Sequence, residues 1–146
     1  MGINDVIDAV ILELQKIFGD GYKYYPENIG QNMETPCFYV QYLRGREDYL
    51  VGNRYSVLSN FVIHGHVNET LNKKADLNTM STDLYQLEYI KLKNGDLIRL
   101  ENRDSHIEDD VVIFTFNVKV HLLKIKSDDS ESMQSINMNE GVKEDE

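Results

Sequence analysis

The stretch VVIFTFNVKVHLLKI, residues 111–125, alternates between two kinds of side chain along its length. Because successive side chains of a strand point to opposite faces of a sheet, this alternation predicts a long strand with one face on a core. The apolar face comprises Val112, Phe114, Phe116, Val118, Val120 and Leu122. The opposite face, which is mostly polar and suits either solvent or a partner, comprises Ile113, Thr115, Asn117, Lys119 and His121.

Further strands are predicted on the N-terminal side of this stretch. The Asn94-Gly95 dipeptide lies in the middle of residues 91–99 and is the strongest short-range signal for a β-hairpin. Three other segments are rich in aromatic and β-branched residues and are predicted strands: 22–25, 37–43 and 54–67.

Two helices are predicted between the strands. Residues 3–18 place apolar side chains at helical spacing with acidic and basic side chains between them, and Gly19-Asp20-Gly21 ends that segment. Asn68 is suited to cap a second helix that runs to about Tyr89. The fold class is therefore α+β: a mixed, largely antiparallel sheet flanked by an N-terminal helix and a mid-chain helix.

Three polar segments, 27–36, 44–53 and 102–110, are predicted loops. The segment 44–53 contains two glycines and several charged residues, which is typical of a long exposed connection. Exposed loops often carry binding residues. The residues predicted to form a subunit or partner interface lie in this loop or at its edge, and they are Arg44, Arg46, Tyr49 and Arg54.

Composition excludes several classes of function. The formal net charge of −10 and the absence of a Lys/Arg block disfavour nucleic-acid binding and an anionic membrane surface. No apolar run approaches the roughly 20 residues of a membrane span. The single cysteine, Cys37, permits no intrachain disulfide, which fits assembly in the cytoplasm.

The chain divides by composition into one domain, residues 1–126, and an acidic tail, residues 127–146. The tail holds seven acidic residues against Lys143 alone, so it carries −6 of the total charge of −10. Low hydrophobicity with high net charge is typical of flexible segments. The tail has two readings: it adds solubility, or it docks on a basic patch of a neighbouring protein.

Catalytic and metal-binding chemistry is weakly represented. His64 and His66 share one face of a predicted strand, and Glu69 is the nearest third ligand for a metal ion. Cys37 follows Pro36 at the start of an aromatic strand, where a buried apolar role is more common than nucleophilic catalysis. We therefore predict no catalytic residue, no cofactor and no metal, with a small metal-binding module as the alternative.

The ordered part of the chain, roughly residues 1–126, resembles small phage tail terminator proteins. The residues that carry the resemblance lie in six short segments: Gly2 to Ala9, Phe18 to Tyr25, Glu27 to Gln31, Glu34 to Val40, Asn53 to Tyr55 and Phe61 to Ile63. The resemblance implies a mixed sheet flanked by helices, in agreement with the pattern described above.

The resemblance also implies a role. Terminators of this kind form a ring, usually a hexamer, at the head-proximal end of the tail tube of a phage or of a phage-like contractile particle such as a bacteriocin. The ring stops tube growth and meets the sheath end, a collar or a head connector. The implied partners are thus other copies of the chain and tail proteins, while DNA only passes through the lumen. An acidic balance suits such a channel because it repels phosphates.

Other functions remain as alternatives. One alternative is a neck or tail-completion protein that joins head to tail. A more general alternative is an adaptor that docks on its partner through the acidic tail. The position of the gene relative to the sheath and tube genes distinguishes the first of these from a terminator.

Overall fold

The computed structural model of the protein describes residues 2–26 and 33–123. Three predicted features lie wholly or partly outside the described residues: the acidic tail 127–146, residues 27–32 of the first loop, and the last two residues of the strand at 111–125. The described residues divide into two compact units, one within residues 2–46 and 58–119 and the other comprising residues 47–57 and 120–123.

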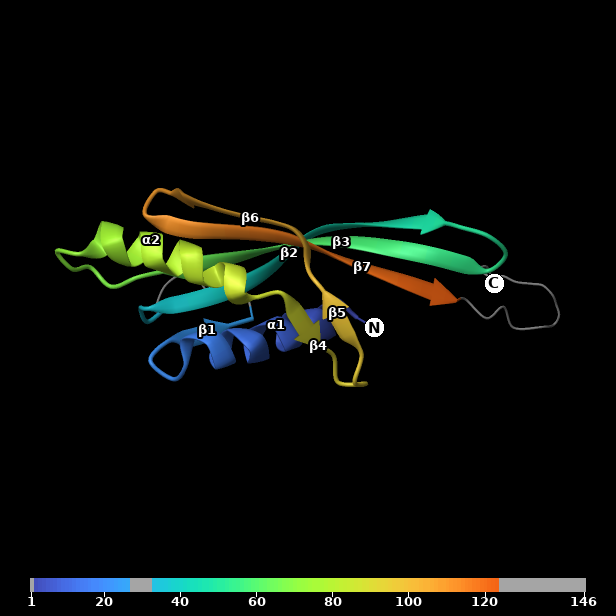
Figure 1. Cartoon of the computed structure of the whole chain (residues 1–146), viewed down its shortest axis with the longest axis horizontal. Helices are drawn as coiled ribbons and strands as arrows, with labels where there is room; N and C mark the ends of the chain where they lie inside the picture. The colour runs from blue at the N-terminus through green and yellow to red at the C-terminus, as the bar shows by residue number, and fades with distance from the viewer. Residues whose placement is uncertain (1, 27–32, 124–146) are drawn as a thin grey trace. The chain divides into compact units, whose positions relative to one another are not determined.

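A five-stranded sheet forms the centre of the fold (Figure 1). Its strands, in spatial order, are β1 (Lys23–Tyr25), β2 (Cys37–Tyr49), β3 (Arg54–His66), β7 (Val111–Leu123) and β6 (Glu101–Glu108). The short β1 runs parallel to β2, whereas β6 runs antiparallel to β7. The sheet is thus mixed and mostly antiparallel, and with two α-helices it confirms the predicted α+β class.

A separate two-stranded hairpin consists of β4 (Tyr89–Lys91) and β5 (Leu97–Arg99). The backbone N–H of Asp96 donates to Asn94 Oδ1 at 2.9 Å, and Gly95 has a φ of 96°. Glycine reaches this left-handed conformation without the steric cost that a side chain would add. The structure therefore confirms the hairpin that the Asn94-Gly95 dipeptide predicts.

The first helix, α1 (Ile3–Phe18), has the predicted bounds. The Asp5 carboxylate accepts a hydrogen bond from the Gly2 backbone N–H at 3.0 Å in the first turn. At the other end, Gly19 has a φ of 81° and its carbonyl accepts a hydrogen bond of 2.7 Å from the Tyr24 hydroxyl. Tyr24 on β1 thus satisfies a carbonyl that the end of a helix leaves unpaired.

The second helix begins later than predicted. α2 spans Lys73–Asp83 and is followed by a 3₁₀ turn, η1 (Leu84–Gln86). Asn68 does not cap it, because its side-chain oxygen accepts a hydrogen bond from the Thr35 hydroxyl at 2.9 Å. The Thr70 hydroxyl accepts a bond from the Asn72 N–H at 3.2 Å, and such local side-chain bonds compete with helix formation.

Two predicted loops are wrong because both segments belong to strands. β2 continues through the charged residues to Tyr49, so only residues 50–53 connect it to β3. β6 occupies most of the segment 102–110, which leaves Asp109 and Asp110, both with positive φ, as the turn into β7. Charged side chains are compatible with these strands because they remain exposed, and charges on an edge strand such as β6 discourage aggregation.

Both helices pack on the same face of the sheet. The Phe18 ring at the end of α1 lies 4.6 Å from the Phe38 ring, measured between centroids. On α2, Met80 approaches Gly65 so closely that a Cβ there would lie 2.5 Å from its sulfur and 3.1 Å from Phe38. The largest fully buried side chains on this face are Phe38, Phe61, Ile63, Phe114 and Phe116.

The opposite face of the sheet has a different character. In the described residues neither α1 nor α2 packs against it, since both contact the Phe38 face. It holds Tyr39 on β2, His64 and His66 on β3, and on β7 the half-buried Thr115 and Asn117. The polar face predicted for residues 111–125 is therefore available to a partner as far as the described residues extend.

Candidate functional site

The four predicted interface residues lie on strands, not in a loop. Arg44 and Arg46 are exposed on β2, and together with Gly45, Leu58 and Asn60 they line a depression of about 300 Å³. Tyr49 ends β2 and Arg54 begins β3, on either side of the turn. Nothing in the structure tests whether these residues contact another chain, so their interface role stays a prediction.

The turn between β2 and β3 exposes consecutive apolar side chains. Tyr49, Leu50 and Val51 are 63%, 41% and 78% exposed. The Arg54 N–H donates to the Val51 carbonyl at 3.1 Å, and Gly52 has a φ of 66°. A glycine at the first central position of a two-residue turn is typical of a type II′ hairpin. We call residues 49–51 the hairpin tip.

The Tyr49 ring is held by an edge contact with Tyr55, at 5.4 Å between centroids. The Leu50 N–H also donates to the Arg54 carbonyl at 2.9 Å. The hairpin tip is therefore built on a hydrogen-bonded turn with an aromatic contact behind it. An apolar surface presented in this way is preorganised for contact with another protein.

The histidine pair lies with Tyr39 on the face of the sheet opposite the two helices, which we call the open face of the sheet. The Tyr39 ring stacks on His64 at 4.3 Å and on His66 at 6.0 Å between centroids. Burial, followed by the neighbouring His66, lowers the pKa of His64, and burial followed by the charge of Lys73 lowers the pKa of His66. Among the described residues, the His66 Nε2 atom is buried without a hydrogen-bond partner.

The predicted metal alternative gains no support from this arrangement. Glu69, the proposed third ligand, pairs with Lys73 at the start of α2. In residues 2–26 and 33–123 there is no group of three or more His, Cys, Asp or Glu side chains placed to hold a metal ion. The two histidines share one face as predicted, but they stack on Tyr39.

Cys37 is fully buried at the start of β2. Burial raises the pKa of its thiol, which keeps the side chain in the protonated, unreactive form. The cysteine therefore acts as a small apolar side chain of the core, as its setting after Pro36 predicts.

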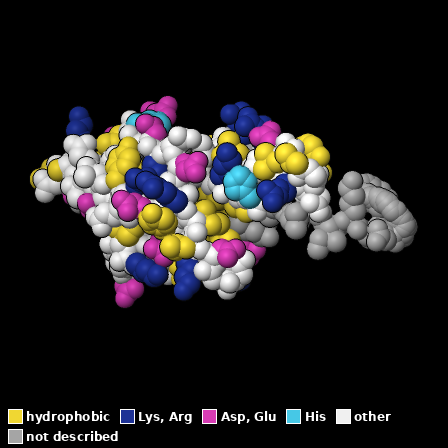
Figure 2. Space-filling view, turned by 45° about the vertical axis from the view of Figure 1, so that its right-hand side comes forward, with side chains coloured by type: hydrophobic (Ala, Val, Ile, Leu, Met, Phe, Trp, Pro, Cys, Tyr) yellow, Lys and Arg dark blue, Asp and Glu magenta, His cyan; other side chains and the backbone are white. Residues whose placement is uncertain are grey.

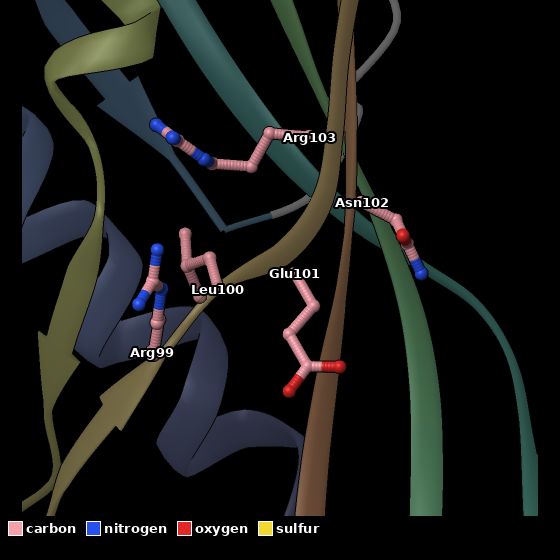
Figure 3. Close-up of a pocket in the computed structure, with 5 residues that line it drawn as sticks. All are labelled: Arg99, Leu100, Glu101, Asn102 and Arg103. Atoms are coloured by element: carbon pink, nitrogen blue, oxygen red, sulfur yellow. The ribbon is translucent and has the colours of Figure 1, made fainter.

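A polar depression of about 520 Å³ lies along the connection from β5 into β6 and is lined by residues 99–103. Figure 3 shows Arg99, Leu100 and Arg103 on one side of the strand and Glu101 and Asn102 on the other. Arg103 donates hydrogen bonds to the Tyr85 and Leu87 carbonyls at 2.6 and 3.2 Å. Its guanidinium fixes η1 to β6, so its role is structural.

An apolar hollow of about 240 Å³ lies between α1 and the β4–β5 hairpin. Its apolar lining comes from Ala9, Leu12 and Leu92, and Leu12 is 56% exposed. Its charged lining residues are Asp5, Asp8, Glu13 and Lys16 on the helix and Lys91 and Lys93 on the hairpin. We call this hollow the α1–β4 groove. Figure 2 shows hydrophobic side chains interspersed with charged ones on one face of the molecule.

The sequence-based prediction of interface residues did not include Leu50, Val51 or Leu12. A signal was present for each. Leu50 and Val51 are consecutive apolar residues inside a segment predicted to be exposed, and Leu12 is an apolar residue of α1 outside the stripe that faces the core. Apolar residues that a predicted core leaves unused are candidates for contacts between proteins.

Comparison with known families places these surfaces in context. The family described as "phage tail terminator protein" matches residues 5–131, a range that includes every described strand and helix except the first two residues of α1. No curated protein is significantly similar to the chain. No helix among the described residues is long and apolar enough to cross a membrane. Because the match covers most of its length, the chain belongs to the phage tail terminator protein family.

Proposed function

We propose that this protein is the terminator subunit of a phage or phage-like contractile tail. Copies form a closed ring, a hexamer, which caps the head-proximal end of the tail tube and stops its polymerisation. The observation that carries this proposal is the family match over residues 5–131, since the family is a structural, non-enzymatic one of phage tails.

The surface of the protein supports this function. A ring subunit needs surfaces for its neighbours, for the tube below and for the component above. The described residues offer three such surfaces: the open face of the sheet, the hairpin tip and the α1–β4 groove.

Subunits in a ring meet through two different surfaces, because a contact between identical patches closes at two copies. One side of a terminator ring binds the last tube subunits. The other side binds the sheath end, a collar or a head connector. Arg44 and Arg46, beside their depression on β2, are candidates for one of these contacts. The protein acts in the virion or particle tail, after assembly in the host cell.

The net charge of −10 fits a ring whose lumen passes DNA without binding it, since negative charge repels phosphates. A strongly positive lumen in a structure of the ring contradicts this part of the proposal.

Labelling of released particles tests the location. A peptide epitope after residue 146, detected with gold-conjugated antibody in the electron microscope, is expected at the head-proximal tube end alone. Labels along the whole tail, or at the distal end, contradict the proposal. An epitope on the tube protein provides the matched control for antibody access.

A further inference from the structure

The depression beside Arg44 and Arg46 has a positively charged lining. Its residues are Arg44, Gly45 and Arg46 on β2 and Leu58 and Asn60 on β3, and its volume is about 300 Å³. A guanidinium group presents several N–H donors in a plane that matches a carboxylate, and an asparagine amide adds two more donors. We call this hollow the Arg44 depression. Its lining is suited to a carboxylate ligand.

The charges on this part of β2 differ in their availability. Arg46 and the two acidic residues that follow it, Glu47 and Asp48, already have interactions within the chain. Glu47 and Asp48 do not line the depression. Arg44 is exposed and, among the described residues, forms no ion pair. The Arg44 guanidinium is therefore the group that can gain a carboxylate partner.

The other two depressions described above are less suited to an anionic ligand. The lining of the α1–β4 groove includes Asp5, Asp8 and Glu13 beside its three lysines, and the lining of the depression at residues 99–103 includes Glu101. Carboxylates at the wall of a site repel a second carboxylate. Of these three depressions, only the Arg44 depression combines a positive lining with the absence of an acidic residue.

The acidic tail, residues 127–146, has the opposite charge. It holds seven acidic residues and Lys143, for a net charge of −6, and Lys124 and Lys126 precede it. The described residues end at Leu123. The 23 residues that follow can extend to about 75 Å, several times the radius of gyration of about 14 Å that is typical of a domain of this size. The tail is therefore long enough to reach an adjacent copy of the chain.

We propose that the acidic tail of one copy of this chain docks on the Arg44 depression of a neighbouring copy. The tail and the depression are different surfaces, so each copy gives its tail to one neighbour and receives a tail from another. Heterologous contacts of this kind generate rings when the rotation between copies closes. The contact rests on the proposed ring, and it links neighbouring subunits of that ring.

Disulfide crosslinking tests the contact in the full-length chain. The variant Asn60→Cys with Ser135→Cys places one thiol in the depression and one between the acidic groups of the tail. Cys37 contributes little background because it is fully buried and burial raises the pKa of its thiol. On mild oxidation of released particles, and of purified protein at high concentration, we expect a ladder of dimers, trimers and larger species. The ladder is expected to weaken in about 0.5 M NaCl, because salt screens exposed charges.

Three controls make the result specific. Ser135→Cys alone permits no species beyond a dimer, because each copy then holds one accessible thiol. Leu71→Cys with Ser135→Cys moves the other thiol to a fully exposed leucine and is expected to give a weaker ladder. The rate at which the Asn60→Cys thiol reacts with a small disulfide, measured in each variant, corrects for the effect of a nearby arginine on the thiol itself.

Charge variants test the recognition. Arg44→Gln in the Asn60→Cys and Ser135→Cys background is expected to reduce the ladder by about two- to fivefold, the effect of an exposed ion pair. Replacement of the seven acidic residues of the tail by amides is expected to reduce it at least as much, and Arg44→Gln then has no further effect. Arg99→Gln is the matched control, because it removes the same charge at another exposed arginine. Circular dichroism confirms that each variant is folded.

Two results overturn the proposal. The first is a ladder that Arg44→Gln reduces no more than Arg99→Gln does, or that is no stronger than the ladder of the Leu71→Cys control. The second is a disulfide that forms only within single chains, which excludes a neighbouring copy as the source of the tail.

Failure of this contact and failure of the proposed function give different results. Crosslinking reports contact between copies whether or not the ring ends a tube. A ladder from a protein whose loss leaves tail length unchanged retains the contact and removes the terminator role. Tails of altered length without a ladder retain the role and remove this contact.

Discussion

The histidine pair is held where protonation is unfavourable. His64 and His66 stack on the buried Tyr39 ring, and burial lowers the pKa of both. Their common face was predictable, because residues two apart in a strand point the same way. The stacking on Tyr39 was not predictable, since it depends on the register between β2 and β3, which the sequence of either strand alone does not determine.

This setting predicts a loss of stability in mild acid. In the unfolded chain a histidine has its ordinary pKa of about 6.5. In the folded chain the pKa of His64 and that of His66 are both lower than this value. As pH falls from 7.5 through this range, the unfolded state takes up protons before the folded state does, so the free energy of unfolding decreases. Denaturation by urea at pH 7.5 and pH 5.5 measures the effect.

The variant His64→Gln with His66→Gln is expected to lose less stability between these two pH values than the native chain. His106→Gln serves as the matched control, because that histidine is exposed on the edge strand β6. An equal loss in the native chain and the double variant contradicts this account of the pair.

At the scale of elements, pairing with neighbouring strands determines the structure of segments whose composition alone is typical of loops. The long strands, the hairpin at Asn94-Gly95 and α1 were predictable from periodicity and turn residues. The segments 44–53 and 102–110 were not, because their charged residues are typical of loops while neighbouring strands hold most of their backbone in the sheet. The start of α2 was likewise misplaced, since Asn68 bonds to Thr35, far away in the sequence.

The packing of α2 on β3 depends on the absence of a side chain at Gly65. A Cβ at Gly65 would lie 2.5 Å from Met80 Sδ and 3.1 Å from Phe38, and both of those residues are buried. Gly65→Ala is therefore expected to reduce the free energy of unfolding by about 1–3 kcal/mol, the usual effect of overpacking a core. Chemical denaturation followed by circular dichroism measures this change.

Gly21→Ala is the control for the general effect of replacing glycine, because nothing lies within 4 Å of a Cβ built there and its φ is not in the left-handed region. Equal stability of the two variants would show that α2 does not need this close approach.

At the scale of the whole molecule, the family was predictable from resemblance and not from chemistry. No residue of the sequence marks a tail terminator by its reactivity, and the family match over residues 5–131 confirms the family that the motifs predict. Interface residues were harder to predict. Tyr49 was among those expected, but the apolar neighbours Leu50 and Val51, and Leu12 on α1, became candidates only once their exposure was visible.

The central claim, that this protein ends tube polymerisation, is tested most directly by tail length. The gene is deleted in the producing strain, and the tails of released particles are measured by negative-stain electron microscopy. We expect a broad distribution with over-long tubes, and a return to uniform length when the native gene is restored on a plasmid. Tails of normal, uniform length in the deletion strain would contradict the terminator function.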